Sequence, residues 1–473
     1  MHPSVTLPMV DGIKVVVPDS LDLITPYVLR EQLDWFEDEI RFLRRMLQPG
    51  QQIVDIGANY GVYTLSIAKV VGSSGHVWSF EPAATTAALL NQSIAANNFD
   101  QVTLEQCALS EKEGTAQLSM STHAELNALV HDNRPAQSTE TVRLITLDGY
   151  AAKSGWHDID FIKIDAEGEE INILKSGGEF FATNSPLVQY EIKAGKDIQL
   201  DLVWAFAELG YDAYRLVPGL DVLVPFHADE PVDPFQLNLF ACKQDRAAEL
   251  ASDGWLISDV PELKSSGELP RDISPDVFAE HAFDWRIKLA TLPYGKKLAS
   301  LWERTVIGEE AGAVEQALAL YALSRDASRS ATERFCALDC SFRRFRRLAE
   351  ASPTHPRLAS LARIAREHGA RVIALDTLLE LCTSIEQNHR VDLDEPFLAP
   401  GERFDTLDPG EALGDWMMVG AAEESERARA FSTFYPGLTA RDRLEWLCRS
   451  TFAGPEMHRR LSLLRQRFNL PEA

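Results

Sequence analysis

The sequence predicts an α/β fold built on a mostly parallel sheet, followed by a separate all-helical region. From about residue 51, short β-branched apolar runs alternate with longer amphipathic stretches, as in the strand–helix–strand units of parallel sheets. Two successive β runs, at 212–217 and 236–243, have no helix between them, which indicates an antiparallel pair at one sheet edge. Beyond about residue 285 nearly every segment has helical periodicity.

The individual elements follow from the same alternation. The expected strands are 53–56, 76–80, 102–109, 158–165 and 185–193, and the expected helices are 30–47, 60–71, 83–98, 169–183 and 197–211. Between residues 114 and 150 the alternation is interrupted by two β runs in sequence, which predicts a small β excursion.

These patterns divide the chain into four regions. We expect an N-terminal β segment and helix at 1–50, a sheet domain at 51–243, a linker rich in Ser, Asp, Gly and Pro at 244–284, and a helical accessory domain at 285–473. Within the helical domain, six small or apolar residues fall at the spacing of a tetratricopeptide-type helix pair: Leu361, Ala362, Ala365, Gly369, Ala374 and Leu378. We nevertheless expect an irregular helical bundle rather than an array of such repeats.

Composition restricts the partners and the compartment. The net charge of −25 argues against nucleic acid, because neutralising phosphates requires clustered Lys and Arg. The sequence has no uninterrupted run of about 18 apolar residues, so we expect no membrane span. The N-terminus lacks the pattern of a signal peptide. The six cysteines have neither disulfide-scaffold nor zinc-ligand spacing, so we expect reduced thiols and a cytoplasmic protein.

The stretch IVDIGANYG, residues 53–61, predicts a ligand-binding turn between a strand and a helix. Its glycines, Gly57 and Gly61, are separated by Asn59, whereas a dinucleotide-binding loop would have a third glycine. The acid Asp55, just before the turn, suits a cationic group better than a phosphate. S-adenosylmethionine meets this demand, because it has an α-amino group, a sulfonium and no phosphate.

A second acid, Glu81, ends the next strand and is placed to accept both ribose hydroxyls of such a cofactor. Taken alone it does not discriminate, since NAD sites use an acid in the same place. A plain glycine turn with a solvated Glu81 is the remaining structural alternative.

The stretch IKIDAEGEE, residues 162–170, predicts a second part of the site. An apolar strand delivers Asp165 and Glu167 to the carboxyl edge of the sheet, where doubly wound folds place their ligands. Glu169 and Glu170 fall in the first turn of the next helix, where the helix dipole favours acids, so they need no functional explanation. A buried lysine requires a partner, and we expect Lys163 to reach a neighbouring carboxylate.

Five stretches together, DIGANYG, FEP, TLD, FIKIDAEGEE and PLVQYEI, resemble in order and spacing the FkbM family of S-adenosylmethionine-dependent methyltransferases. The resemblance covers about residues 35–243. It implies a Rossmann-like class I methyltransferase sheet of about seven strands with an antiparallel edge, and most often O-methylation of sugar or polyketide-type hydroxyls. It also implies that Cys107 and Ala108 flank the adenine and that Asp165 and Glu167 lie beside the methyl donor.

Methyl transfer to oxygen requires alignment of donor and acceptor and gains from a general base. We expect Asp165 or Glu167, with Glu191 from the YEI stretch, to supply the base, or to hold a divalent cation that lowers the pKa of the acceptor. The alternative is that Asp165 only hydrogen-bonds the cofactor and Glu167 only caps local structure.

The sequence leaves the acceptor and the partners open. The leading interpretation is a methyltransferase acting on a small-molecule or glycan acceptor; an N- or C-methyltransferase on the same scaffold, and a cofactor-binding interaction protein, are the alternatives. His123 and His131 flank the stretch ELNALV and are candidates for lining an acceptor pocket. The helical domain is expected to serve homo-oligomerisation, acceptor binding or docking of a protein partner.

Overall fold

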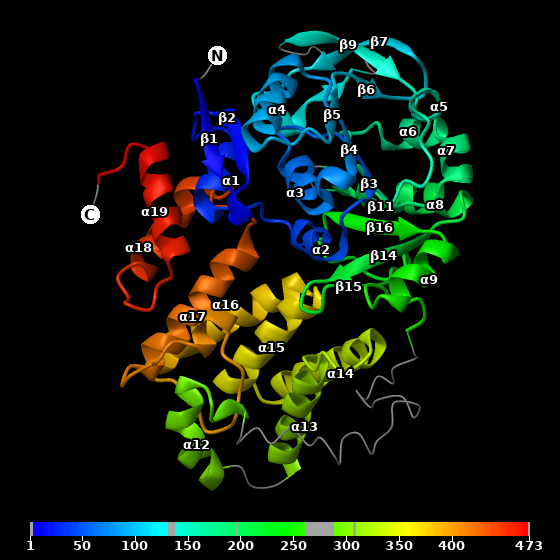
Figure 1. Cartoon of the computed structure of the whole chain (residues 1–473). Coiled ribbons are helices and arrows are strands. Elements are labelled where there is room, and N and C mark those ends of the chain that lie inside the picture. Colours follow the sequence, from blue (N-terminus) through cyan, green and yellow to red (C-terminus); the bar gives the residue numbers. More distant parts are fainter. Residues whose placement is uncertain (1–2, 131–137, 195–196, 261–287, 306–308, 472–473) are drawn as a thin grey trace. The chain divides into compact units, whose positions relative to one another are not determined.

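The structure is a computed structural model that describes residues 3–130, 138–194, 197–260, 288–305 and 309–471. The chain forms two compact units (Figure 1). The sheet unit comprises Met1–Leu216, Leu223–Ser258 and Arg465–Ala473, and the helical unit comprises Val217–Val222 and Asp259–Leu464. The chain thus passes between the units more than once, which the predicted linear order of regions does not include.

The sheet unit is built on a mixed sheet with the expected antiparallel edge. In spatial order its strands are β15 (Val222–Pro225), β14 (Asp212–Val217), β16 (Asn238–Cys242), β11 (Leu187–Glu191), β10 (Phe161–Ile164), β3 (Gln52–Ile56), β4 (His76–Phe80) and β5 (Val102–Glu105). Strands β11, β10, β3, β4 and β5 pair in parallel, whereas β16 is antiparallel to both β11 and β14. The predicted Rossmann-like architecture is confirmed, with eight strands in place of about seven.

Helices cover both faces of this sheet. Helices α2 (Asp38–Met46), α3 (Val62–Val71) and α9 (Gln244–Ser252) contribute to the core on one face, and α5 (Leu147–Ser154), α6 (Glu170–Lys175), α7 (Gly178–Thr183) and α8 (Asp201–Glu208) to the core on the other. Successive strand residues alternate between the faces, so Ile53 lies in the first core and Val54 in the second.

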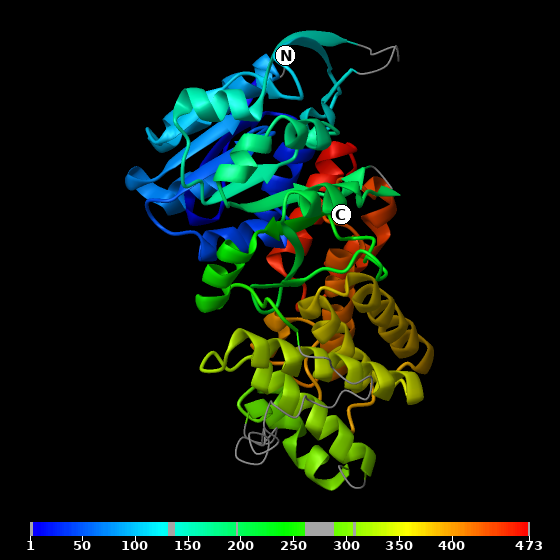
Figure 2. The ribbon, with the colours of Figure 1, turned by 90° about the vertical axis from the view of Figure 1, so that its right-hand side faces the viewer.

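The remaining elements of the sheet unit are smaller. They are β1 (Ser4–Pro8), β2 (Lys14–Pro18), α1 (Ile24–Gln32), α4 (Ala84–Asn97) and the short ladder of β12 (Lys193–Ala194) with β13 (Asp197–Ile198). The predicted β excursion is a separate four-stranded sheet of β6 (Ala108–Leu109), β9 (Thr139–Ile145), β7 (Gly114–Ser119) and β8 (Ala128–Leu129), with its long β7–β9 pair at the top of the view in Figures 1 and 2.

Several predicted elements are broken in two. One of them, the helix predicted at 197–211, divides into β13 and α8. The helix predicted at 30–47 is wrong, because α1 ends at a left-handed Leu33 and the chain turns before α2 begins at Asp38. The helix predicted at 169–183 is interrupted between α6 and α7 at Gly177, where a Cβ would lie 2.6 Å from the Leu147 side chain. The strand predicted at 102–109 divides between two different sheets.

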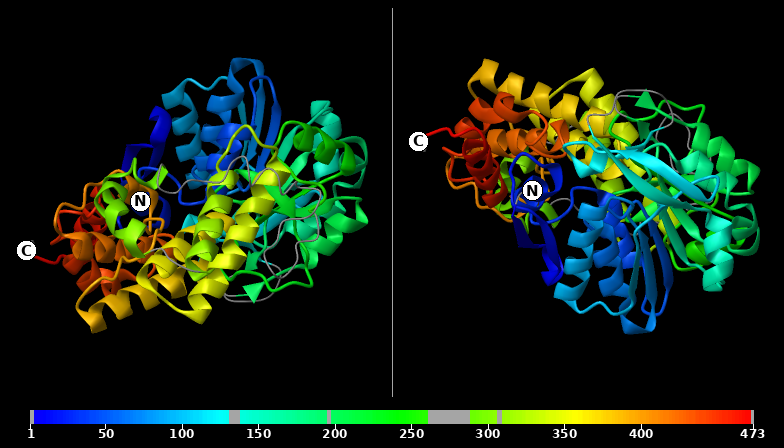
Figure 3. Two further views of the ribbon diagram at one scale, coloured as in Figure 1. Left: turned by 90° about the horizontal axis from the view of Figure 1, so that it is seen from below. Right: turned by 90° about the horizontal axis from the view of Figure 1, so that it is seen from above.

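The helical unit consists mainly of consecutive helices packed on one another. They are α12 (Pro293–Thr305), α13 (Glu309–Ser324), α14 (Ala331–Ala351), α15 (His355–His368), α16 (Arg371–Asn388), α17 (Leu413–Arg429), α18 (Arg441–Leu447) and the greater part of α19 (Pro455–Arg467). Helices α13 to α17 contact their neighbours in chain order, and α14, α15 and α16 lie side by side (Figure 3). The predicted helix pair at 361–378 corresponds to α15 and α16, which turn at Gly369.

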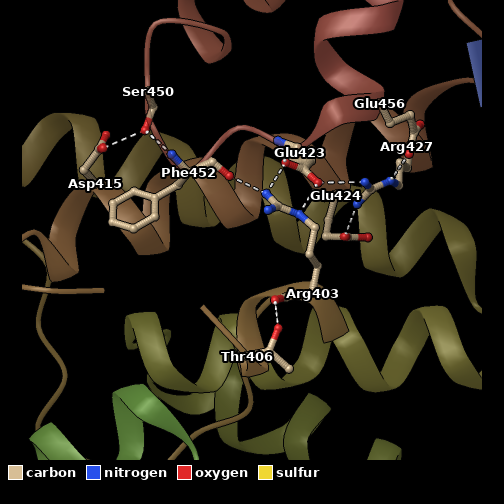
Figure 4. Close-up of polar contacts among 10 residues, drawn as sticks. Arg403, Thr406, Asp415, Glu423, Glu424, Arg427, Ser450, Phe452 and Glu456 are labelled. Atoms are coloured by element: carbon tan, nitrogen blue, oxygen red, sulfur yellow. Dashed lines mark hydrogen bonds and ion pairs between the residues drawn. The ribbon is translucent and has the colours of Figure 1, made fainter. Parts of the chain in front are cut away.

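An ion-pair network centred on Glu423 joins α17 to the short helix η4 (Glu402–Asp405) and to the start of α19 (Figure 4). The carboxylate of Glu423 is fully buried and accepts hydrogen bonds from Arg403, Arg427 and the backbone N–H of Gly454, at 2.7 to 3.0 Å. Arg427 also pairs with Glu424 and Glu456. Such a network costs desolvation and is stable only when every charge keeps its partners.

No helix among the described residues is long and apolar enough to cross a membrane. All six cysteines are free thiols, four of them buried and two half-buried.

Candidate active site

The predicted site residues gather at the carboxyl edge of the parallel strands. Strand β3 is followed in the chain by β4 on one side of it, and β10 lies on its other side, so the strand order reverses between β3 and β10. Open α/β sheets bind their ligands at this kind of reversal, outside the carboxyl ends of the strands. Residues 57–61 follow β3, Glu81 follows β4, Asp165 to Gly168 follow β10, and Glu191 ends β11.

The loop after β3 is shaped by its glycines. Gly57 has a φ of +80°, and a Cβ on it would lie 1.7 Å from the carbonyl oxygen of Asp165, so only glycine fits there. Gly61 has a φ of +86° at the start of α3, and its Cβ would meet the Leu90 side chain. The loop after β3 and the loop after β10 therefore touch directly, through backbone.

Glu81 connects the glycine loop to the next loop. Its carboxylate accepts the backbone N–H of Asn59 at 3.0 Å and that of Ala83 at 2.9 Å. Asn59 itself is in the left-handed conformation, with a φ of +50°. Glu81 is only 6% exposed, and burial raises its pKa to about 7. A carboxylate in this position fixes the loop and keeps lone pairs for a further donor.

Asp55 lies beneath the loop, on the face of the sheet that α2, α3 and α9 cover. It is completely buried, and its Oδ2 accepts a hydrogen bond of 2.5 Å from the Thr64 hydroxyl of α3. Its Oδ1 is also buried and has no hydrogen-bond partner among the described residues. Burial raises the pKa of this carboxyl. The structure thus places Asp55 at the predicted strand end, but with no exposed surface.

Three carboxylates meet at the ends of β10 and β11. Oxygens of Asp165, Glu167 and Glu191 lie within 4.8 Å of one another, close enough to share a proton or a cation. Partial burial and the neighbouring acids raise the pKa of Glu167 to about 8 and that of Glu191 to about 10. At neutral pH this cluster therefore holds at least one proton, because like charges at this distance disfavour full ionisation.

The loop that carries these acids is fixed by Glu170. The Glu170 carboxylate accepts the backbone N–H groups of Ala166, at 2.9 Å, and Gly168, at 3.0 Å. Glu167 has a φ of +50°, which non-glycine residues adopt only when the surroundings hold them there. Glu170, which the sequence pattern explained by the helix dipole alone, thus also shapes the site.

Lys163 has the partner that a buried lysine requires. Its ammonium lies 2.7 Å from Asp165 Oδ2 and 5.0 Å from the centroid of the Tyr63 ring. The prediction that it reaches a neighbouring carboxylate is confirmed.

The two residues expected beside the adenine lie at the same edge of the sheet. Cys107 follows β5 and is completely buried, and burial raises the pKa of its thiol to about 11. Ala108 begins β6 and is half-buried. In this structure the thiol of Cys107 is covered, so a ligand here would meet Ala108 and backbone.

Two acids of the site had no signal in the sequence. Glu37, from the segment before α2, accepts hydrogen bonds from Tyr63 at 2.5 Å, Trp35 at 3.0 Å and Asn238 at 3.1 Å. Burial raises its pKa. Because its partners come from residues up to 201 positions away, no local pattern reveals it.

The second such acid, Glu125, is held from another direction. Its Oε1 accepts both the backbone N–H, at 3.0 Å, and the hydroxyl of Thr25, in the first turn of α1. Burial raises the pKa values of Tyr60 and Glu167, and the nearby Glu125 adds to both shifts. His123, in the same loop, is half-buried, whereas His131 lies outside the described residues.

A surface pocket lies at the opposite edge of the sheet. It is lined in part by Gln51 and Asp160, which precede β3 and β10, and by Arg246. Arg246 already pairs with Glu249 at 3.0 Å and lies 3.7 Å from Asp160. None of the predicted site residues lines this pocket, and we assign it no role in the site.

The family model of the methyltransferase FkbM domain matches residues 55–213. The sheet unit contains a methyltransferase domain of the FkbM family. The match spans the glycine loop, Glu81 and the three carboxylates, whereas Glu37 and the helical unit lie outside it. No curated protein matches the chain.

Solved methyltransferase structures match the same part of the chain. An FkbM methyltransferase from Methylobacillus flagellatus KT is 16% identical, over 41% of this chain and 44% of that one, with a TM-score of 0.29. An S-adenosylmethionine-dependent O-methyltransferase from Thermotoga maritima is 15% identical, over 51% and 78%, with a TM-score of 0.25. An O-methyltransferase from Bacillus cereus, in complex with SAH, is 14% identical, over 44% and 80%, with a TM-score of 0.26. The fold of the FkbM domain is established by its own strand order.

Proposed function

We propose that the protein is an S-adenosylmethionine-dependent methyltransferase that methylates a hydroxyl of a sugar, a glycan or a secondary metabolite. One observation carries the proposal. Three elements converge where the strand order reverses, within an FkbM methyltransferase domain. They are the glycine loop, the acid Glu81 that is expected to bind the ribose, and the three clustered carboxylates.

The residues of the site fit S-adenosylmethionine. The cofactor supplies a methyl group on a positively charged sulfur, and its amino-acid end has an ammonium. Asp55 offers a buried, unpartnered carboxylate oxygen beneath the glycine loop, which is an acceptor for such a cation. Glu81 has lone pairs for the ribose hydroxyls, and the acids around the loop would repel a dinucleotide pyrophosphate.

The carboxylates divide the remaining work. The ammonium of Lys163 pairs with Asp165, whose side chain is still 34% exposed, and this suits Asp165 to contact the cofactor. Glu167, with surface open to solvent and a pKa of about 8, is our candidate for the general base that accepts the hydroxyl proton. Glu191, beside it, then shares that proton.

A divalent cation bound by the same three carboxylates is the alternative to a shared proton. It would lower the pKa of the acceptor hydroxyl by coordination. Turnover measured with EDTA, and then with added Mg²⁺, separates the two. Full activity in EDTA is expected from the proton-sharing mechanism, and activity that returns only with Mg²⁺ would contradict it.

The choice of a hydroxyl acceptor rests on the family resemblance. N- and C-methyltransferases use the same scaffold, so the acceptor atom must be measured. Incubation with methyl-labelled S-adenosylmethionine and a panel of sugars, amines and polyketide alcohols is the direct assay. Label recovered in an amine and in no alcohol would reject O-methylation. We also propose a cytoplasmic location, because all six cysteines are free.

Calorimetric titration with S-adenosylmethionine tests the cofactor assignment before any acceptor is known. We expect one site per chain and binding at micromolar concentrations. Absence of binding at these concentrations would reject the enzyme and favour an interaction protein.

A further inference from the structure

A row of polar side chains crosses the sheet face that α2, α3 and α9 cover, directly beneath the candidate site. Lys163 on β10 is in register with Asp55 on β3 and with Gln189 on β11. All three residues are at most 4% exposed. Residues two positions earlier on the same strands, such as Phe161 and Leu187, are apolar and belong to the core of that face. The polar row is therefore confined to the ends of the strands nearest the site.

Lys163 is directed along its own strand toward the site. Its ammonium donates to Oδ2 of Asp165, two residues further on, at 2.7 Å. The Tyr63 ring of α3 lies 5.0 Å from the ammonium, and the Tyr63 hydroxyl contacts both Gln189 and Glu37. The ammonium therefore lies under an aromatic ring, where it is attracted by the face of the ring.

Asp165 is held at three points. Its backbone N–H donates to the carbonyl of Ile56 at 3.1 Å, its carbonyl lies against Gly57, and one carboxylate oxygen is bound by Lys163. Its side chain nevertheless remains 34% exposed, so part of the carboxylate is accessible to a ligand. The first two contacts fix the backbone, and only the third fixes the direction of the carboxylate.

We propose that Lys163 is a positioning residue, whose ammonium holds the Asp165 carboxylate in the correct orientation for the cofactor. The inference rests on the proposed function, because it takes the ligand of Asp165 to be S-adenosylmethionine. Lys163 does not touch the cofactor itself. It acts through Asp165, and the ring of Tyr63 keeps it from turning away.

The test uses calorimetry to compare the whole chain and its variants in their affinity for S-adenosylhomocysteine (SAH). Lys163→Met removes the charge and keeps most of the volume. Loss of a charge-assisted hydrogen bond that orients the carboxylate is expected to weaken SAH binding about 10- to 100-fold. Lys163→Arg keeps the charge and is expected to restore affinity to within about threefold of the native chain.

Two control variants isolate this effect from general loss of stability. Gln189→Leu changes an equally buried polar residue of the same row, whose amide donates to the hydroxyl of Tyr63. Lys243→Met removes a lysine that also lies over a tyrosine ring, 5.3 Å from the centroid of Tyr211. Lys243 follows β16 near the amino end of β11, away from the carboxyl edge that carries the site. Both are expected to bind SAH as the native chain does, even if their thermal unfolding temperatures fall.

Each outcome of these measurements supports or contradicts a positioning role for Lys163. If Lys163→Met folds and binds SAH as tightly as the native chain, Lys163 is structural only. Equal losses in Lys163→Met and Gln189→Leu would also contradict positioning. If Lys163→Met does not fold, Lys163→Gln replaces it under the same criterion, and a folded Lys163→Arg that fails to bind SAH would by itself overturn the proposal. A native chain that binds no SAH rejects the proposed function instead.

Discussion

At the scale of single residues, the acids of the site have different neighbours. Asp165 has a cation at 2.7 Å, whereas Glu167 and Glu191 have other carboxylates as neighbours. Environments that push neighbouring carboxyl groups apart in pKa are the usual way in which a site assigns acid and base roles. The three acids were predicted from the sequence, but their division of roles depends on Lys163.

Glu167→Gln is expected to lower kcat by about 10²- to 10⁴-fold, because it removes the proposed base. A base must be ionised to act, so kcat of the native enzyme should rise with pH through about 8, the pKa of Glu167. Steady-state kinetics across this pH range, together with SAH titration, provide the measurement. Full turnover in the variant, with SAH affinity unchanged, would show that Glu167 is not the base.

Glu81 predicts a pH dependence of stability. Its pKa is about 7 in the folded chain, whereas a glutamate fully exposed to water has a pKa of 4.5, so the folded state binds the extra proton between these values. Stability therefore falls as pH rises from about 5 to about 7, by about 3 kcal/mol from this group. In Glu81→Gln that part of the fall should disappear, as measured by urea unfolding at each pH. Identical pH profiles for the two proteins would contradict the assignment.

At the scale of elements, the site is a contact between two loops. The glycine loop after β3 and the acidic loop after β10 meet at Gly57 and Asp165. In each loop a glutamate accepts hydrogen bonds from backbone N–H groups. Glu81 pins the first loop and Glu170 the second. Sequence spacing predicted both loops, but not the direct contact between their backbones.

Gly57→Ala and Gly168→Ala form a matched pair that tests this contact. Both glycines have a positive φ, of +80° and +101°, so both variants incur about 1 to 2 kcal/mol of backbone strain. Only at Gly57 does a Cβ also collide with backbone, 1.7 Å from the Asp165 carbonyl oxygen, whereas nothing lies within 4 Å at Gly168. Urea unfolding should show a clearly larger loss for Gly57→Ala, with loss of SAH binding. Equal losses would mean that the loops do not touch.

At the scale of the whole molecule, the chain combines an FkbM methyltransferase domain with a helical unit of different construction. The sheet unit is stabilised by two apolar cores, and Asp55, Glu81 and Lys163 are buried at its candidate site. The helical unit buries charge within its own packing, around Glu423 (Figure 4). The two units should therefore respond differently to loss of a single carboxylate.

Glu423→Ala is expected to destabilise the helical unit by about 3 to 5 kcal/mol, because it leaves Arg403 and Arg427 without their buried partner. SAH affinity should not change, since the proposed cofactor residues all belong to the sheet unit. Glu350→Ala is the control: Glu350 is 62% exposed and pairs with an exposed Arg346, so at most about 0.5 kcal/mol should be lost. Calorimetric unfolding measures both, and similar losses would contradict a structural role for the network.

The sequence alone determined the class of fold, the antiparallel edge, the family of the sheet domain and the residues at the carboxyl ends of β3, β4, β10 and β11. These follow from local patterns, because periodicity and motif spacing depend on neighbouring residues. It did not predict the break of the 30–47 helix at Leu33, since a left-handed leucine has no propensity signal. Nor did it reveal Glu37, whose partners lie far away in the chain. Only the tertiary structure could bring Glu37, Tyr63 and Lys163 beneath Asp165, because burial and charge partners arise when separate strands and helices pack together.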